Sequence, residues 1–238
     1  MSLKSDHIVA VKDLSEFFDY VESHNVLADS DLTLYRGQAD SKWILEPRIS
    51  RTLEYADMQK TEAEILREFT RLGRSMIPLD VLSNQWDLLA FAQHHGLKTR
   101  LLDWTTNPLI ALWFAFIEPM DVKTRSVWFI FLGESDIADN THGSPFEQPR
   151  TLAFKPNHVS QRITAQNGWF TNHKFNIKKG RSSRLEYLST FKEKIYRIDI
   201  PDKARINILE GLTKFGINHA SVFPDLGGLT NYLNWRTK

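Results

Sequence analysis

One stretch of the chain, residues 93–109, constrains the fold more than any other. It reads QHHGLKTRLLDWTTNPL. Gly96 predicts the end of a helix, the apolar residues before Asp103 predict a short strand, and Pro108 predicts the start of a second helix after a polar corner at 104–107. Ligands, above all anions, bind where a strand ends in a polar corner before a helix N-terminus. The stretch therefore predicts a ligand site at this corner.

Hydrophobic periodicity places further helices and strands on both sides of this stretch. It predicts a helix over 11–24, a strand over 32–37 that carries Arg36, and a buried central strand over 126–132. Residues 162–171 are typical of two strands joined by a tight turn. The remaining predicted elements are helices over 52–72, 83–95 and 202–215, strands over 43–45, 194–200 and 220–223, and a short helix opened by Asp225.

This order of elements decides the fold class. Helices and strands in mixed order, with a hairpin late in the chain, favour an α+β fold over a doubly wound sheet. The chain has 238 residues, 42% of them hydrophobic, which is enough to bury a full core. We therefore expect a single α+β domain over residues 1–238, in which a mixed or antiparallel sheet packs with helices and the 11–24 helix packs onto it.

Charge and cysteine content exclude several function classes. Thirty basic and 29 acidic residues give a formal charge of +1, so no global field draws the protein to nucleic acid or to an anionic membrane. The absence of cysteine excludes a disulfide framework, thiolate zinc sites and a cysteine nucleophile, and it suits a reducing cytosol. No apolar segment is long enough to span a bilayer. We expect a cytoplasmic protein that does not contact a membrane.

The motifs of several common enzyme classes are missing. The sequence contains no Walker loop, no GxGxxG, no GxSxG and no HExxH pattern. His94 and His95 are adjacent, and neighbouring helical residues point about 100 degrees apart, while no second His follows at a ligand spacing. No metal site is expected.

Four segments of the chain carry a family resemblance. They are residues 35–38 (YRGQ), 95–115, 162–170 and 223–228. Together, over residues 32–233, they resemble the FRG domain family, which is named for its Phe/Tyr-Arg-Gly motif. The block at 95–115 is long and ordered enough to be specific, whereas the first motif alone is weak.

The same residues are more distantly similar to the ADP-ribosyltransferase fold. In those enzymes a strand-borne Arg anchors the NAD phosphates, a Ser/Thr-rich strand end leads into a helix, and a Glu on a later strand contacts the nicotinamide ribose. Arg36, Thr105 with Thr106, and Gln166 follow in that order. The resemblance implies an NAD-using ADP-ribosyltransferase or an NAD glycohydrolase-like effector, a toxin or phage-defence protein, with NAD as cofactor and a protein or nucleic acid as acceptor.

The resemblance also implies that the pocket is centred on Arg36. A guanidinium grips a pyrophosphate through two parallel charge-assisted bonds, so Arg36 is expected to hold the phosphates and Trp104 to stack on the nucleotide. Thr105 or Thr106 is expected to orient the ribose. The full set of expected cofactor-binding residues is Tyr35, Arg36, Gln38, His95, Trp104, Thr105 and Thr106.

The expected catalytic residues are Arg36, Asp103 and Gln166. Gln166 stands where ADP-ribosyltransferases carry a Glu, and an amide does not stabilise a developing oxocarbenium charge as a carboxylate does. Either Asp103 or Asp225 then supplies the negative charge, or the activity is altered or lost.

Several of these residues also have purely structural interpretations. Arg36 and Asp103 would form an ion pair at the strand end, and Trp104 would belong to the core. Thr105 and Thr106 would cap the helix that follows.

Two other functions fit the same residues. A non-catalytic module would recognise a nucleotide or nucleic acid through Arg36, Arg100 and a basic cluster. A metal-dependent phosphodiester hydrolase would use Asp103 with His95. The basic cluster consists of Lys174, Lys178, Lys179, Arg181 and Arg184.

Overall fold

A mixed β-sheet forms the centre of the molecule. The computed structural model describes residues 4–27, 32–52, 58–141, 143–157, 160–176, 181–182 and 184–237. Within them, a seven-stranded sheet has the order β1-β9-β4-β2-β3-β6-β5, and β7 pairs with β8 in a separate two-stranded sheet. β1 runs parallel to β9, and the other neighbours in the large sheet are antiparallel. The strands are β1 (Ile8–Ala10), β2 (Leu32–Gln38), β3 (Leu101–Thr105), β4 (Thr124–Leu132), β5 (Leu152–Phe154), β6 (Gly168–Asn172), β7 (Phe175–Asn176), β8 (Arg181–Ser182) and β9 (Ile195–Pro201).

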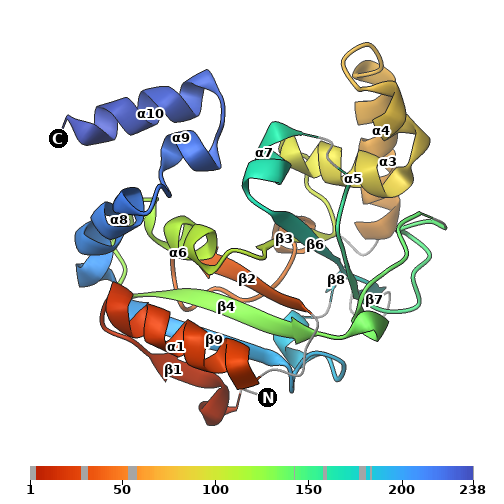
Figure 1. Ribbon diagram of the computed structural model, residues 1–238. Coiled ribbons are helices and arrows are strands. Elements are labelled where there is room, and N and C mark those ends of the chain that lie inside the picture. The colour runs from red at the N-terminus through yellow and green to blue at the C-terminus, as the bar shows by residue number, and fades with distance from the viewer. Residues whose placement is uncertain are drawn as a thin grey trace.

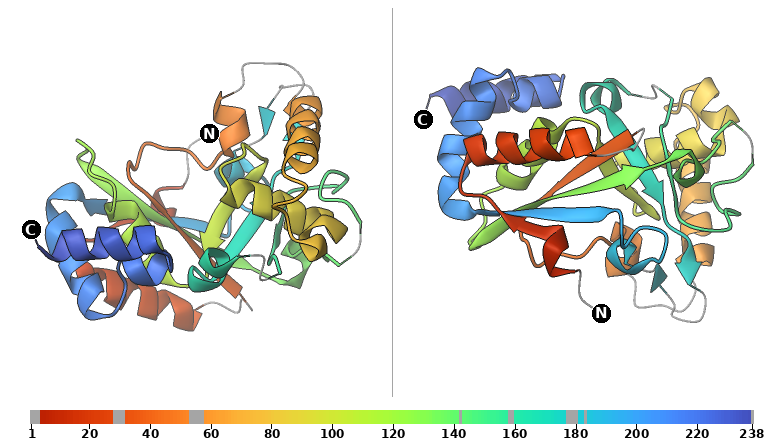
Figure 2. Two further views of the ribbon diagram at one scale, coloured as in Figure 1. Left: turned by 90° about the horizontal axis from the view of Figure 1, so that it is seen from above. Right: turned by 60° about the horizontal axis from the view of Figure 1, so that its bottom comes forward.

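Six of the described helices lie in two groups at opposite ends of this sheet. The C-terminal helices α8, α9 and α10 lie at one end, and α3, α4 and α5 lie at the other, in all three views (Figures 1 and 2). The helices are α1 (Leu14–Leu27), α2 (Arg48–Thr52), α3 (Met58–Leu72), α4 (Leu79–Ser83), α5 (Gln85–His94), α6 (Pro108–Phe116), α7 (Gln161–Ala165), α8 (Arg205–Lys214), α9 (His219–Val222) and α10 (Leu226–Arg236). The mixed sheet packed with helices confirms the expected α+β class.

The core divides into clusters on the two faces and at one end of the sheet. On one face α1, α6 and α8 bury apolar side chains against β4 and β9, with Phe17 and Phe116 fully buried. The other face carries a second cluster around Leu34 and Trp104. A third cluster, around Trp86, packs α5 against β3, β5 and β6. Burial of the apolar stripe of α1 explains why the predicted N-terminal helix docks on the sheet.

Gly37 allows α6 to lie directly on β2. A Cβ atom at this position would stand 1.9 Å from the carbonyl oxygen of Ala111 and 2.6 Å from the amide nitrogen of Ala115. Only a residue without a side chain permits such a contact. Helix α6 starts immediately after the polar corner, where the side chain of Asn107 caps it and Pro108 occupies the first turn. The Arg-Gly motif and the polar corner are therefore joined by one packing contact.

The backbone pairing between β2 and β3 is very short. In the described part of the sheet, β2 pairs with β4 from Leu32 to Gln38, but it pairs with β3 only through Tyr35 and Thr105. Residues 36–38 of β2 therefore have no ladder partner on their β3 side. An opening lined by side chains takes the place of backbone pairing.

Several local predictions are wrong. Residues 161–165 form helix α7, not the first strand of a hairpin, because Ser160 caps them through the Ile163 amide at 3.2 Å. The expected strand at 220–223 is helix α9. The helix expected to begin at residue 83 begins at Gln85 as α5, because the Asn84 side chain caps it, and Ser83 is the last residue of α4. The predicted 52–72 helix is represented by α2 and α3, and residues 53–57 lie outside the described residues.

Replacing Gly37 by Ala should strongly destabilise the fold. The new methyl group would collide with main-chain atoms of α6, so the helix must shift, and we expect the free energy of unfolding to fall by about 3 kcal/mol or more. Gly133→Ala is the matched control, because a Cβ there meets nothing within 4 Å and φ is −99°. Urea unfolding measures both variants. Equal midpoints for the two would contradict the close contact.

Candidate functional site

A cavity of about 480 Å³ opens where β2 and β3 part. Its volume lies in the range of pockets that hold small ligands, roughly 300–1,000 Å³. Both ends of the molecule contribute to its walls, because α5, α6, α7 and the segment after α9 all line it. Its ionisable lining residues are Arg36, Arg51, His94, Asp103, Glu118 and Arg162, and its aromatic ones are Tyr35, Trp43, Trp104, Phe114 and Phe223.

Arg36 bridges the gap between the parted strands. Its Nη1 donates to the carbonyl oxygen of Asp103 at 2.7 Å and lies 3.6 Å from the Asp103 carboxylate. The side chain is 18% exposed, and its buried Nε has no hydrogen-bond partner among the described residues. Burial lowers the pKa of Arg36, the Asp103 carboxylate opposes that shift, and the charge of Arg51 adds to it. Since arginine stays protonated, an anion that bound beside this buried guanidinium would stabilise it.

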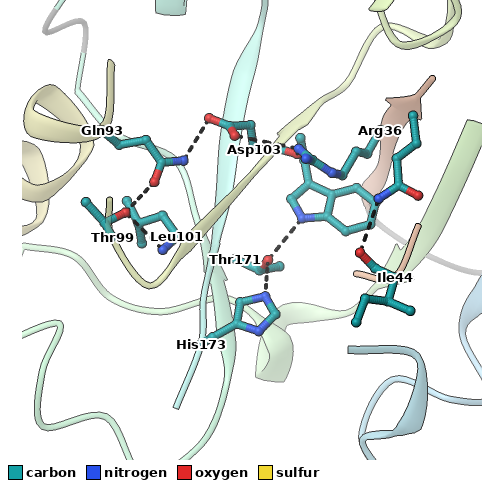
Figure 3. Close-up of polar contacts among 10 residues, drawn as sticks. Arg36, Ile44, Gln93, Thr99, Leu101, Asp103, Thr171 and His173 are labelled. Carbon is teal, nitrogen blue, oxygen red and sulfur yellow. Dashed lines mark hydrogen bonds and ion pairs between the residues drawn. The ribbon is translucent and has the colours of Figure 1, made fainter. Parts of the chain in front are cut away.

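The Asp103 carboxylate is oriented by an amide. Gln93 Nε2 donates to Asp103 Oδ1 at 2.9 Å, and the Thr99 hydroxyl donates to Gln93 Oε1. Figure 3 shows Gln93 between Thr99 and Asp103, with Arg36 on the other side of the carboxylate. Thr99 fixes which end of the amide faces Asp103, because it offers a donor to the amide oxygen. The Asp103 side chain is 62% exposed, so it is oriented and still open to a ligand.

Two predicted binding residues use their polar atoms inside the protein. Trp104 is 3% exposed, and its Nε1 donates to the Thr171 hydroxyl at 3.0 Å. Gln38 accepts from Trp128 Nε1 at 2.8 Å and donates to the Ile44 carbonyl at 3.3 Å. Trp104 and Gln38 both line the cavity. They contribute to its wall with the atoms that do not take part in these hydrogen bonds. Among the predicted residues, Tyr35 is buried as well, in the first core cluster, with its ring 5.9 Å from that of Phe129.

Thr105 ties the polar corner together. Its hydroxyl donates to the Gln166 carbonyl at 2.6 Å and accepts the Asn107 amide at 3.0 Å. Asn107, not Thr105 or Thr106, caps α6. Gln166 lines the cavity, while its Nε2 donates to the Val222 carbonyl at 3.3 Å. Thr106 is exposed and lies outside the cavity lining.

His94 lines the cavity, whereas His95 does not. Helix α5 ends here because Gly96 takes a positive φ of 91°. This leaves His95 exposed, with its ring 4.4 Å from that of Phe91. Burial lowers the pKa of His94, and the charges of His95 and Arg162 lower it further, against two nearby carboxylates. The imidazole that faces the cavity is therefore neutral near pH 7.

Asp225 does not line the cavity. It caps α10 by accepting the Gly228 amide at 2.8 Å, and its Oδ2 lies 3.2 Å from Arg162 Nε. The Arg162 guanidinium stands 4.3 Å over the Phe223 ring. Of the two predicted carboxylates, Asp103 is the one that lines the cavity.

Arg100 is a core residue and does not face the cavity. It is 3% exposed, and it pairs with the fully buried Glu62 at 2.6 Å. The predicted basic cluster is partly engaged elsewhere, because Lys174 donates to the Pro149 carbonyl at 2.7 Å. Lys178, Lys179 and the side chain of Arg181 lie outside the described residues.

Sequence reasoning missed several cavity residues. Gln93 and His94 belong to the stretch 93–109 that predicts the ligand site. Their place in the last turn of the predicted helix, just before the strand that carries Asp103, is a signal that could have identified them. Trp43 and Arg51 belong to no motif, and no signal in the sequence marks them. The missed lining residues are Ala39, Trp43, Arg51, Gln93, His94, Ala111, Phe114, Glu118, Met120, Arg162 and Phe223.

Part of the chain that lines the cavity is similar to a known protein domain. Residues 31–124 match a family model described as the FRG domain. Over these residues the chain is similar to the FRG domain. The FRG domain match spans β2 to the start of β4 and includes Arg36 and Asp103, whereas Arg162 and Gln166 lie beyond it. No curated protein and no solved structure matches the chain.

Two further findings concern metals and membranes. Among the described residues, no group of three or more His, Cys, Asp or Glu side chains could hold a metal ion. Likewise, none of the described helices is long and apolar enough to cross a membrane.

Replacing Arg162 by Gln should raise the pKa of His94. The wild-type value should lie below the ordinary value of about 6.5, and loss of a nearby positive charge makes protonation easier. A pH titration of the imidazole signals by NMR measures the shift. His219 is the internal control, because its pKa is lowered by burial and Arg162 is not among the causes. An unchanged His94 pKa would show that Arg162 does not act on this cavity.

Proposed function

We propose that this protein binds NAD in the cavity and breaks the bond between nicotinamide and ribose. The ADP-ribose group would pass to water, as in an NAD glycohydrolase, or to a protein or nucleic-acid acceptor, as in an ADP-ribosyltransferase. The observation that carries the proposal is Arg36, a largely buried guanidinium with one nitrogen bound to Asp103 and its Nε unpartnered among the described residues.

Arg36 suits the pyrophosphate of a dinucleotide. Its Nη1 is anchored to a backbone carbonyl, which fixes the direction of the planar group. The remaining donors are then available to oxygens of an anion that enters the cavity. Charge-assisted bonds of this kind are roughly twice as strong as neutral ones, and they would satisfy the buried nitrogen.

Asp103 suits the chemistry of the glycosidic bond. When that bond breaks, the electron pair leaves with neutral nicotinamide, and positive charge develops on the ribose ring. A carboxylate near the ring stabilises this charge, and the attacking water or acceptor loses its proton to Asp103 or to solvent. The Asp103 carboxylate is exposed to the cavity and oriented by Gln93. Gln166 instead would contact a ribose hydroxyl.

The aromatic wall suits the flat rings of a nucleotide. Trp43 is 42% exposed, and Phe114 and Phe223 are half-buried, so each presents ring surface to the cavity. Stacking on such surfaces is worth roughly 1–3 kcal/mol per base in nucleic-acid complexes. These rings, more than the buried Trp104, would hold the adenine or nicotinamide.

Nicotinamide release should depend on both Arg36 and Asp103. With purified protein and NAD, followed by mass spectrometry, we expect Arg36→Ala to lower the rate about 100-fold or more, because two charge-assisted bonds are lost. Asp103→Asn should lower it about 100- to 1,000-fold, as the loss of an electrostatic stabiliser does. Arg67→Ala, which removes an exposed arginine outside this cavity, should leave the rate unchanged. Turnover by a folded Arg36→Ala protein at the wild-type rate would refute the assignment.

A second candidate is a nucleotide-binding module without turnover. It is favoured by Gln166, whose amide already bonds the Val222 carbonyl and which supplies no carboxylate at the expected position. In that case NAD binds with Arg36-dependent affinity, no nicotinamide appears, and Asp103→Asn leaves binding intact. Calorimetry beside the mass-spectrometric assay separates the two functions.

A further inference from the structure

A second arginine faces the same cavity as Arg36. Arg51 is exposed on α2 and lines the cavity together with Trp43. Within the described part of the chain, Arg51 makes no ion pair or hydrogen bond, so its guanidinium is free to meet a ligand. Asp103, the carboxylate closest to Arg36, is already shared with Gln93.

The segment that carries Trp43 and Arg51 is firmly anchored. The Ser41 amide donates to the Thr124 carbonyl at 3.0 Å, and the Leu185 amide donates to the Leu45 carbonyl at 3.1 Å. Leu45 and Ile49 are fully buried. A binding group on an anchored segment loses little conformational freedom when a ligand arrives. The segment therefore presents an aromatic ring and a cation from a preorganised wall.

The two guanidinium groups lie close enough to interact. The charge of Arg51 lowers the pKa of Arg36, in addition to the larger effect of burial. Like charges that face one cavity repel each other, and an anion between them relieves the repulsion. A diphosphate carries negative oxygens on two phosphorus atoms and can meet two cations at once, whereas a monophosphate concentrates its charge at one.

We propose that Arg51 and Trp43 make the cavity selective for nucleoside diphosphate groups. Arg36 and Arg51 share the diphosphate, and the attached base stacks against Trp43. This inference rests on the proposed function, because the diphosphate is the central group of NAD. It adds a specificity residue outside the YRGQ motif and outside the polar corner.

Calorimetry with ADP and AMP, in buffer containing a chelator, tests the inference. Wild-type protein should bind ADP about tenfold more tightly than AMP or better, since one additional charge-assisted contact is made. Arg51→Gln should bring the two affinities within about threefold of each other and leave AMP binding nearly unchanged. Arg51→Lys should recover part of the preference, because a point charge remains.

Two variants serve as controls for this test. Arg48→Gln removes the same charge from the same helix at a position outside the cavity lining, and it should keep the wild-type ratio. Trp43→Leu should weaken ADP and AMP equally, by about tenfold, and leave binding of inorganic pyrophosphate unchanged. Equal melting temperatures would show that the exposed substitutions do not disturb folding.

The outcomes separate this inference from the proposed function. If Arg51→Gln keeps the full ADP preference while Arg36→Ala abolishes NAD turnover, the inference is wrong and the proposed function stands. A wild-type protein that binds neither ADP nor pyrophosphate would overturn the inference directly. If ADP binds with an Arg51-dependent preference but NAD is not cleaved, the diphosphate site is correct and the catalytic proposal fails.

Discussion

The contact between Gly37 and α6 determines where the cavity forms. The main chain of α6 rests on β2 at this point, and α6 begins directly after β3. The same contact therefore holds the end of β3 beside β2 at the pair of Tyr35 and Thr105. Beyond that pair the strands separate, and side chains fill a space that a hydrogen-bond ladder would otherwise occupy. A packing constraint in the core thus produces an opening with polar walls.

Positive charge is concentrated in this opening although the whole chain is nearly neutral. Arg36, Arg51 and Arg162 reach it from three different elements, and they outnumber the two carboxylates of its lining, Asp103 and Glu118. Composition gives only the sum over the chain, a formal charge of +1, and cannot show that distant residues converge. The local excess arises from the fold, and it is what makes an anionic ligand the natural occupant.

The sequence predicts those elements whose ends are set by a glycine or a proline, or which contain an uninterrupted apolar run. The helix, strand and helix of residues 85–116 follow from Gly96 and Pro108, and the apolar run of β4 marks a central strand. α7 was predicted as a strand, because five residues are too few to show helical periodicity and an Asn-Gly turn follows them. The walls formed by Trp43 and Arg51 could not be predicted, since their place depends on how the segment after β2 folds back over the cavity.

The contact at Gly37 also has an evolutionary consequence. A larger residue in a protein core is often tolerated when a neighbouring side chain becomes smaller. Here the neighbours are Ala111 and Ala115, and the atoms in the way are a carbonyl oxygen and an amide nitrogen. No substitution at either alanine removes those atoms. Glycine at position 37 therefore has no compensating partner, and a lineage could lose it only by moving α6, the helix that shapes the cavity.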